Sequence, residues 1–158
     1  MTSAASPEFW LYLPQMRMSF GAITERARAA EQAGFDGIAL MDHLAPPGLP
    51  SADMYDAITT AAVIAMGTAQ LRIGHLVLCS SFRHPAVLAQ QMVSLDHLSG
   101  GRCELGIGWG SVPGELTRFR ARMLRPANQP RFRSASRLFL ARISVSSDTT
   151  VPWGWACV

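Results

Sequence analysis

The sequence predicts an α/β fold, because short apolar runs alternate four times with amphipathic helical segments, in units of about 30 residues. Each candidate strand is a nearly continuous apolar run, as is typical of parallel strands that are covered on both faces. A chain of 158 residues that is 49% hydrophobic is long enough to form one domain with a sizeable core. The periodicity leaves two architectures open, half of an eight-unit barrel and a small open sheet.

The first unit begins with an aromatic-rich run at residues 9–13, which is stopped by Pro14 and predicts a strand. Ser19 is the predicted N-cap of a helix that continues to about Ala33, because apolar residues recur there at three- and four-residue spacing. Gly34 then supplies the left-handed residue that ends many helices.

The second unit brings a histidine to the end of a strand. Residues 35–41 form the predicted strand and continue directly into Asp42 and His43. Because side chains alternate along a strand, His43 faces the interior side if Leu40 faces the helices. His43 then stands at the carboxyl end, where α/β proteins bind ligands. A proline-rich loop follows, and residues 53–70 form the second predicted helix.

The third and fourth units end in a glycine-rich stretch. Residues 71–78 form the third predicted strand, and a third helix runs from Pro85 to Gly100. The fourth strand, residues 102–108, leads into alternating glycines at Gly106, Gly108 and Gly110. These glycines are expected to leave the strand end free of side chains, so that a flat or phosphorylated ligand can approach backbone N–H groups. A glycine-rich turn that only lets the chain bend is the structural alternative.

Composition limits the class of protein and divides the chain in two. No apolar run approaches the roughly 20 residues that span a bilayer, and the N-terminus shows no signal peptide. Three cysteines without a CxxC motif argue against structural zinc and suit a reducing cytoplasm, and we predict no metal ligands. Residues 1–115 carry 6 Arg and 10 acidic residues, net −4, whereas residues 116–158 carry 8 Arg and one Asp, net +7.

Four linked motifs point to a known family. They are Leu13-Pro-Gln-Met-Arg-Met-Ser19, Gly34-Phe-Asp-Gly-Ile-Ala-Leu-Met-Asp-His43, His84-Pro85-Ala-Val-Leu-Ala89 and Gly100-Gly-Arg-Cys-Glu-Leu-Gly-Ile-Gly-Trp-Gly110. In this order and spacing the chain resembles the bacterial luciferase-like monooxygenase superfamily, and most closely its branch of deazaflavin- or flavin-dependent oxidoreductases. The resemblance covers residues 8–116. It implies that this domain is the first half of a (β/α)8 TIM barrel, with four parallel βα units.

The resemblance also implies a cofactor, either the deazaflavin coenzyme F420 or FMN, across the carboxyl ends of the strands. It implies that His43 is the catalytic acid/base, since an imidazole titrates near neutral pH and can exchange a proton as hydride moves between substrate and ring. Two segments are expected to contact the cofactor, and family members often have a non-prolyl cis peptide in the first of them. The expected cofactor-binding residues are Leu78, Cys79 and Ser80 in the first segment, and Gly108, Trp109, Gly110 and Ser111 in the second.

Several residues near this predicted site also have structural explanations. His43 could simply bond a loop, and Asp42 could either orient His43 or cap that loop. Cys79 is expected to be a packing residue, because the sequence shows no partner base for it. Arg83 and His84 could contact a phosphate or cap the third helix.

A second histidine lies in the middle of the third predicted strand. By the same alternation, His75 is expected to face Glu104 across the barrel interior. We expect this buried pair to be structural rather than catalytic.

The resemblance ends after Leu116, and residues 117–158 form a second, non-family segment. It is basic and is expected to be irregular, apart from an apolar run at 138–143 that predicts one helical turn. One hypothesis is that a reading-frame shift near 117–120 replaced the family's second half, which would leave a truncated and inactive half barrel. The alternative is a genuine basic tail that binds nucleic acid or an acidic partner, which ranks lower because the segment has no recognised nucleic-acid-binding motif.

The function that the resemblance implies is oxidoreduction of a small organic substrate with a deazaflavin or flavin, by hydride transfer. An FMN-dependent monooxygenase is the second enzymatic interpretation, and a catalytically inactive half-barrel remnant is the non-enzymatic one. We expect a small-molecule substrate and no membrane partner. Two copies could close a barrel as a homodimer, although complete barrels make the dimer contacts in family members.

Overall fold

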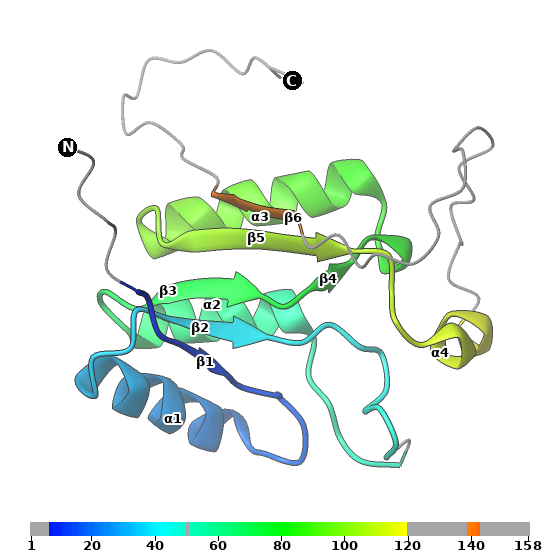
Figure 1. Cartoon of the computed structure of the whole chain (residues 1–158), viewed down its shortest axis with the longest axis horizontal. Helices are drawn as coiled ribbons and strands as arrows, with labels where there is room; N and C mark the ends of the chain where they lie inside the picture. Colours follow the sequence, from blue (N-terminus) through cyan, green and yellow to red (C-terminus); the bar gives the residue numbers. More distant parts are fainter. Residues whose placement is uncertain (1–6, 50, 120–138, 143–158) are drawn as a thin grey trace.

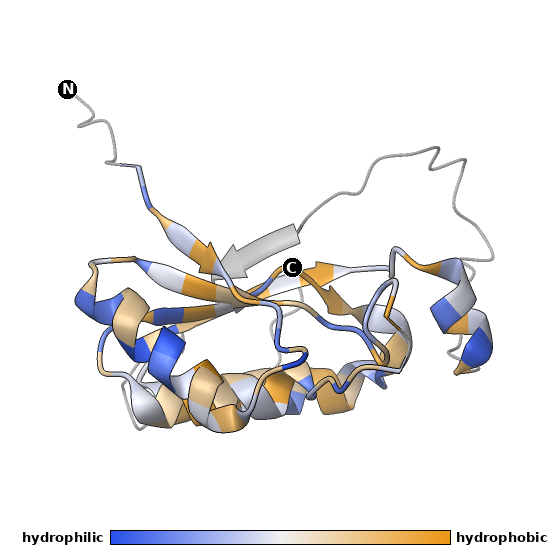
Figure 2. Cartoon of the chain, turned by 90° about the horizontal axis from the view of Figure 1, so that it is seen from below, coloured by the Kyte–Doolittle hydropathy of each residue, from blue (hydrophilic) through white to orange (hydrophobic). Residues whose placement is uncertain are grey.

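The computed structural model describes residues 7–49 and 51–119, together with the backbone of 139–142. Within these residues, three helices pack on one face of a mostly parallel sheet (Figures 1 and 2). The strands are β1 (Trp10–Tyr12), β2 (Gly37–Leu40), β3 (Arg72–His75), β4 (Leu78–Cys79), β5 (Cys103–Gly108) and β6 (Phe139–Arg142). The helices are α1 (Phe20–Gln32), α2 (Ala57–Gly67), α3 (Pro85–Ser99) and the short α4 (Pro113–Arg118), and a 3-10 turn η1 spans Ser80–Phe82.

The strand order confirms four parallel βα units. β1, β2, β3 and β5 are neighbours in that order and pair in parallel, and β4 also pairs in parallel with β5. The prediction of one continuous strand at 71–78 was wrong. From Gly74 to Leu78 the chain advances four residues while β5 advances three, so an extra residue separates β3 from β4. The peptide bond between Leu76 and Val77 in this interruption is cis, just before the segment where a cis peptide was expected.

Local capping residues set the helix ends. Ser19 caps α1, where its hydroxyl accepts a hydrogen bond from the Ala22 N–H (3.2 Å), and Gly100 ends α3 with φ of 70°. The second helix begins later than predicted, at Ala57, because the Asp56 carboxylate caps it. None of the helices in the described part of the chain is long and apolar enough to cross a bilayer.

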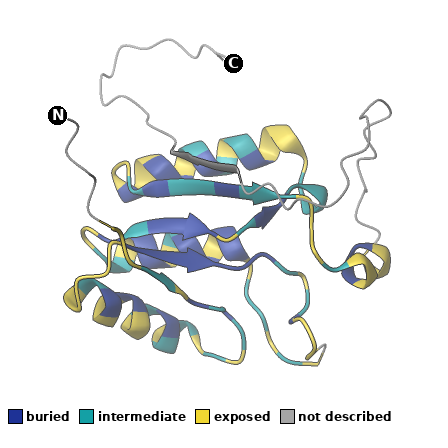
Figure 3. Cartoon of the chain, viewed as in Figure 1, coloured by how far each residue is buried: buried dark blue, intermediate teal, exposed yellow. Residues whose placement is uncertain are grey.

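The core lies between the sheet and the helices. Ile38, Leu40 and Ile73 are fully buried on the sheet face that α1 and α2 cover, where they meet Ile23 and Ile64. Figure 3 shows the resulting continuous buried layer through β2 and β3. This confirms the predicted alternation, in which Leu40 faces the helices and the residues beside it face the barrel interior.

The opposite, interior face of the sheet carries an aromatic ring where glycines make room for it. A Cβ atom on Gly37 would lie 2.6 Å from the Trp10 ring, and one on Gly74 would lie 3.1 Å from it. The Arg72 guanidinium stacks over the same ring at 5.0 Å from its centre and pairs with Glu104 at 2.6 Å. Trp10 therefore covers β2 and β3 near their amino ends. A side chain at Gly37 would displace the ring, and one at Gly74 would make a tight contact with it.

The strand β6 corrects the expectation of a helical turn at 138–143. Phe139–Arg142 instead pair antiparallel with β5, along the edge opposite to β3 and β4 (Figure 1). The physical reason is that a strand edge offers unpaired N–H and C=O groups, which an extended segment satisfies better than a single helical turn does.

His75 does not face Glu104, so that prediction was wrong. The register pairs His75 with Leu40 and pairs Glu104 with Gly74, which places His75 on the helix face of the sheet. The ring is 1% exposed, and neither nitrogen makes a hydrogen bond of normal geometry to any described residue. Burial lowers the pKa of His75 from its usual value of 6.5 to about 4.

We expect His75 to make stability fall with acidification. Between pH values of about 6.5 and 4 the unfolded chain binds a proton on His75 and the folded chain does not, so the free energy of unfolding decreases as pH falls through this window, by up to about 3 kcal/mol. His75→Leu should flatten this limb of the profile. Urea unfolding of both proteins at several pH values measures it, and equal slopes would contradict the assignment.

Candidate functional site

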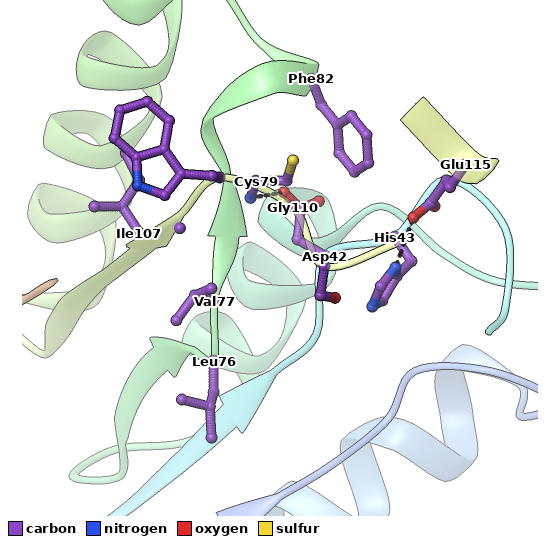
Figure 4. Close-up of a pocket in the computed structure, with 12 residues that line it drawn as sticks. Asp42, His43, Leu76, Val77, Cys79, Phe82, Ile107, Gly110 and Glu115 are labelled. Carbon is purple, nitrogen blue, oxygen red and sulfur yellow. Dashed lines mark hydrogen bonds and ion pairs between the residues drawn. The ribbon is translucent and has the colours of Figure 1, made fainter. Parts of the chain in front are cut away.

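A pocket of about 200 Å³ opens at the carboxyl ends of β2, β4 and β5 (Figure 4). Parallel α/β sheets bind ligands at this end, because the loops that follow the strands converge there. The lining residues are Asp42, His43, Leu76, Val77, Cys79, Phe82, Ile107, Gly108, Trp109, Gly110, Ser111 and Glu115.

His43 forms the polar centre of this pocket together with Glu115. The His43 Nδ1 atom lies 2.7 Å from Oε2 of Glu115, and both side chains are largely buried. The other carboxylate oxygen, Oε1, accepts hydrogen bonds from the backbone N–H groups of Leu44 and Ala45 (3.1 Å for Ala45). Glu115 thus fixes the imidazole and the start of the loop that follows it.

Sequence reasoning did not select Glu115, which lies 72 residues from its partner His43. A signal was present nonetheless. Pro113 marks the start of a helix directly after the glycine-rich strand, and Glu115 lies in the first turn of that helix, α4. Since β2 and β5 end at the same edge of a parallel sheet, a carboxylate after one strand can meet a histidine after the other.

The alternating glycines of β5 have a different role from the expected one. A Cβ atom on Gly106 would lie 2.0 Å from the His75 carbonyl oxygen, and one on Gly108 would lie 2.6 Å from Cγ2 of Val77. The neighbouring segment therefore fills the space above these two glycines. The expectation of a strand end without side chains in the way was wrong there, although Gly108 still lies in the pocket lining. Gly110, with φ of 96°, borders the pocket itself.

Six of the eight predicted site residues line the pocket, and Leu78 and Ser80 do not. Leu78 is fully buried in the hydrophobic core, because it lies on the helix face of β4. Ser80 begins the turn η1, outside the pocket lining. Cys79 is buried in the pocket wall, and burial raises the pKa of its thiol, which favours the unreactive protonated form and a packing role. The functional roles of the six pocket residues stay predictions.

Asp42 neither orients His43 nor caps the loop after it. Its carboxylate accepts a hydrogen bond from a backbone N–H of β4 and pairs with both terminal nitrogens of Arg83. Arg83 also bonds Asp56, so among the described residues it acts as an ion-pair partner and not as a helix cap. His84 does cap α3, since its Nδ1 accepts an N–H from the first turn at 3.3 Å.

The chemistry of the lining suits a flat ring. The side chains of Leu76, Val77 and Ile107 give apolar walls, whereas the His43–Glu115 pair lies at another side of the pocket (Figure 4). A volume of about 200 Å³ lies below the roughly 300–1,000 Å³ of complete small-molecule sites. The described residues thus form a small pocket with apolar walls and a histidine–carboxylate pair at one side.

Comparison with known proteins decides the family. The profile of the luciferase-like monooxygenase family matches residues 2–138. The chain belongs to this family. The matched range extends past Leu116, where we expected the resemblance to end, and the domain boundary at that position stays a prediction.

Curated relatives of the chain include a reductase and a dehydrogenase. The chain is 36% identical over 99 residues to 5,10-methylenetetrahydromethanopterin reductase of Methanolobus tindarius, with coverage of 63% of the chain and 27% of the relative. It is 33% identical over 105 residues to an F420-dependent glucose-6-phosphate dehydrogenase of Microbacterium testaceum, with coverage of 66% and 30%. The chain therefore spans less than a third of the length of these relatives.

A solved family structure confirms the fold. The oxygenating constituent of 3,6-diketocamphane monooxygenase from Pseudomonas putida, solved in complex with FMN, superposes with a TM-score of 0.63 at 24% identity, covering 72% of this chain and 32% of that one. The luciferase-like neighbours are TIM barrels, and the four βα units described above correspond to the first half of such a barrel.

We expect Gly108→Ala to destabilise the protein by about 1–3 kcal/mol, because the new methyl group overlaps Val77. Val77→Ala in the same chain should recover part of this loss, which a double-mutant cycle of urea unfolding measures as a coupling of about 1 kcal/mol. Gly114→Ala is the matched control, since a methyl group there would meet no atom within 4 Å and the residue lies in a helix. Additive effects at Gly108 and Val77 would contradict this explanation of the glycine.

Proposed function

We propose that this chain supplies the cofactor end of a flavin- or deazaflavin-dependent oxidoreductase that transfers hydride between a small organic substrate and the cofactor. Its relatives are F420- and flavin-dependent reductases, dehydrogenases and monooxygenases, which supports oxidoreduction as the general class. The observation that carries the proposal is the His43–Glu115 pair beside apolar pocket walls at the carboxyl edge of the sheet. We expect the cofactor to be coenzyme F420 or FMN.

His43 is the proposed acid/base. The Glu115 carboxylate accepts the proton on Nδ1, which leaves the lone pair on Nε2 available within the pocket. When an alcohol is oxidised, Nε2 takes the hydroxyl proton, and Glu115 stabilises the imidazolium that forms. In the reverse direction the same atom returns the proton to the nascent alkoxide.

The apolar wall is the proposed surface for the ring. Leu76, Val77 and Ile107 would contact one part of it, and Trp109, which is 56% exposed, would cover it from the end of β5. When bound, a deazaflavin or flavin would supply the two-electron chemistry, so the protein's contribution is to bind the ring, orient it and hold the proton.

Monooxygenation is the second candidate, because a family structure contains FMN. The identity of the cofactor separates the two functions. A deazaflavin favours hydride chemistry and reacts poorly with oxygen, whereas reduced FMN activates it. Slow reoxidation of the reduced complex in air therefore supports the hydride-transfer function, and fast reoxidation supports the monooxygenase.

We expect the purified chain to bind FMN or the deazaflavin coenzyme saturably. A titration that monitors the cofactor's fluorescence measures this binding. Trp109→Ala should weaken that binding about ten-fold, because a ring contact is lost. Phe9→Ala is the matched control, an exposed aromatic residue outside the pocket lining. No binding of either cofactor by the folded chain would overturn the proposal and favour an inactive half barrel.

In a cofactor-binding sample, His43→Asn should lower kcat/KM by about 10²–10⁴-fold, because the proton acceptor is lost. Glu115→Gln keeps an acceptor for the backbone N–H groups of Leu44 and Ala45 but removes the charge that stabilises the imidazolium. It should lower kcat/KM by a smaller factor than His43→Asn does. Cofactor reduction with glucose 6-phosphate, the substrate named for one relative, is the assay. An unchanged kcat/KM in Glu115→Gln would contradict the role of Glu115.

A further inference from the structure

A group of three charged side chains, two of them largely buried, lies beside the pocket, and only Asp42 among them lines it. Arg83 lies just after η1, Asp42 at the end of β2, and Asp56 at the start of α2. The Arg83 side chain is 11% exposed and that of Asp42 is 2% exposed, whereas the Asp56 side chain is 47% exposed. The charges of Arg83 and Asp42 are buried so deeply that they lose much of their hydration energy. A role other than that of solvated surface charges is therefore expected for them.

The contacts of Asp42 join two separate walls of the pocket. Its Oδ2 accepts the backbone N–H of Cys79 at 2.7 Å, and its carboxylate binds Arg83 through two nitrogens, with 2.9 Å between Oδ1 and one of them. His43 is the next residue in the chain. The peptide that carries the proposed acid/base is therefore bonded directly to the β4–η1 segment, which forms the facing wall.

Asp56 completes the arrangement from the far side. Its Oδ2 accepts a hydrogen bond from Nη2 of Arg83 (2.8 Å). Its Oδ1 accepts a hydrogen bond from the backbone N–H of Thr59 (2.8 Å) and so caps α2. Burial opposes ionisation of Arg83, but the hydrogen bonds and charges of Asp42 and Asp56 outweigh it and raise the pKa of Arg83. The guanidinium is thus held charged, in one orientation, between the end of β2 and the start of α2.

We propose that Asp42, Arg83 and Asp56 form a positioning clamp that sets the separation between the His43 wall and the Cys79 wall of the pocket. This inference rests on the proposed function, because it concerns how that same site holds a ring ligand. Arg83 acts through Asp42 and is a positioning residue. The competing role, a direct contact with a cofactor phosphate, is disfavoured because both terminal nitrogens of the guanidinium are already bonded to carboxylates.

Comparing binding of the cofactor with and without its phosphate distinguishes the positioning role of Arg83 from direct phosphate binding. We expect Arg83→Gln to raise the Kd about ten-fold or more both for FMN and for riboflavin, which lacks the phosphate, since the walls that hold the ring are no longer fixed. The same comparison applies to the deazaflavin with and without its phosphate-bearing side chain. A loss confined to the phosphorylated form would overturn the clamp and make Arg83 a phosphate ligand.

A milder variant and a control substitution at another arginine distinguish the proposed role from a general folding defect. Asp56→Asn keeps an oxygen that caps α2 and removes the charge, and we expect it to weaken binding less than Arg83→Gln does, by about three-fold. Arg72→Gln breaks a comparable ion-pair group, with Glu8 and Glu104, at the other end of the sheet. At a matched loss of Tm it should change the cofactor Kd by less than about two-fold. Equal effects of Arg72→Gln and Arg83→Gln on binding would overturn the clamp.

A measurement without cofactor keeps this inference separate from the proposed function. Hydrogen exchange at the Cys79 amide should become about ten-fold faster or more in Arg83→Gln and stay within about two-fold of the wild type in Arg72→Gln. If the wild-type chain binds no cofactor, the proposed function fails, and exchange at Cys79 still decides whether Arg83 fixes this wall. Unchanged exchange in Arg83→Gln would overturn the clamp.

Discussion

The approach of one strand to the next over two glycines is the constraint on which the pocket depends. At Gly106 a methyl group would lie 2.0 Å from a backbone carbonyl, a distance that no side-chain rearrangement can relieve. Because this position lacks a Cβ atom, the interrupted strand β3–β4 can lie against β5, with its extra residue beside the pocket. Val77 then occupies the space above Gly108 and forms the apolar wall. The glycines therefore help to build the pocket by admitting the neighbouring segment, while Gly108 and Gly110 also lie in the pocket lining.

The polar part of the pocket follows from strand direction. All four βα units run parallel, so the residues after β2 and after β5 reach the same edge. Glu115 can meet His43 there without a long connection, and its second oxygen satisfies two N–H groups of the loop after β2. A buried carboxylate needs such partners, because an unpaired charge at this depth would be strongly destabilising. The same contacts that stabilise the loop also hold the imidazole in one tautomer.

Most of the fold could be predicted from the sequence, because its signals are local. Ser19 and Gly100 set helix ends through contacts within one turn, and alternation placed Leu40 toward the helices. Apart from the start of α2, which the local cap Asp56 sets, the main failures depend on contacts between distant segments. The orientation of His75 follows from the register with β2, and the partner of His43 lies 72 residues away. A single sequence gives no measure of register or of such long-range pairs, whereas helix periodicity repeats every few residues.

Two partly buried arginines at opposite ends of the sheet have different kinds of hydrogen-bond partner. At the amino end, Arg102 donates to the carbonyl oxygens of Ala65 and Leu71, each at 2.8 Å, and so closes the turn between α2 and β3. Those partners are neutral and do not titrate. At the carboxyl end, Arg83 is held by two carboxylates, and the bonds of one of them reach the pocket wall. Hydrogen bonds to carbonyl oxygens do not depend on pH. Carboxylate partners add negative charge and fix the orientation of the guanidinium, beside the site of the proposed proton transfer. A carboxylate also holds the turn at the amino end, because Oε1 of Glu31 accepts hydrogen bonds from the backbone N–H groups of Ala69, Gln70 and Leu71. What distinguishes the carboxyl end is depth: among the residues that the structure describes, the most deeply buried ion pair, Arg83–Asp42, lies where the proposed chemistry takes place.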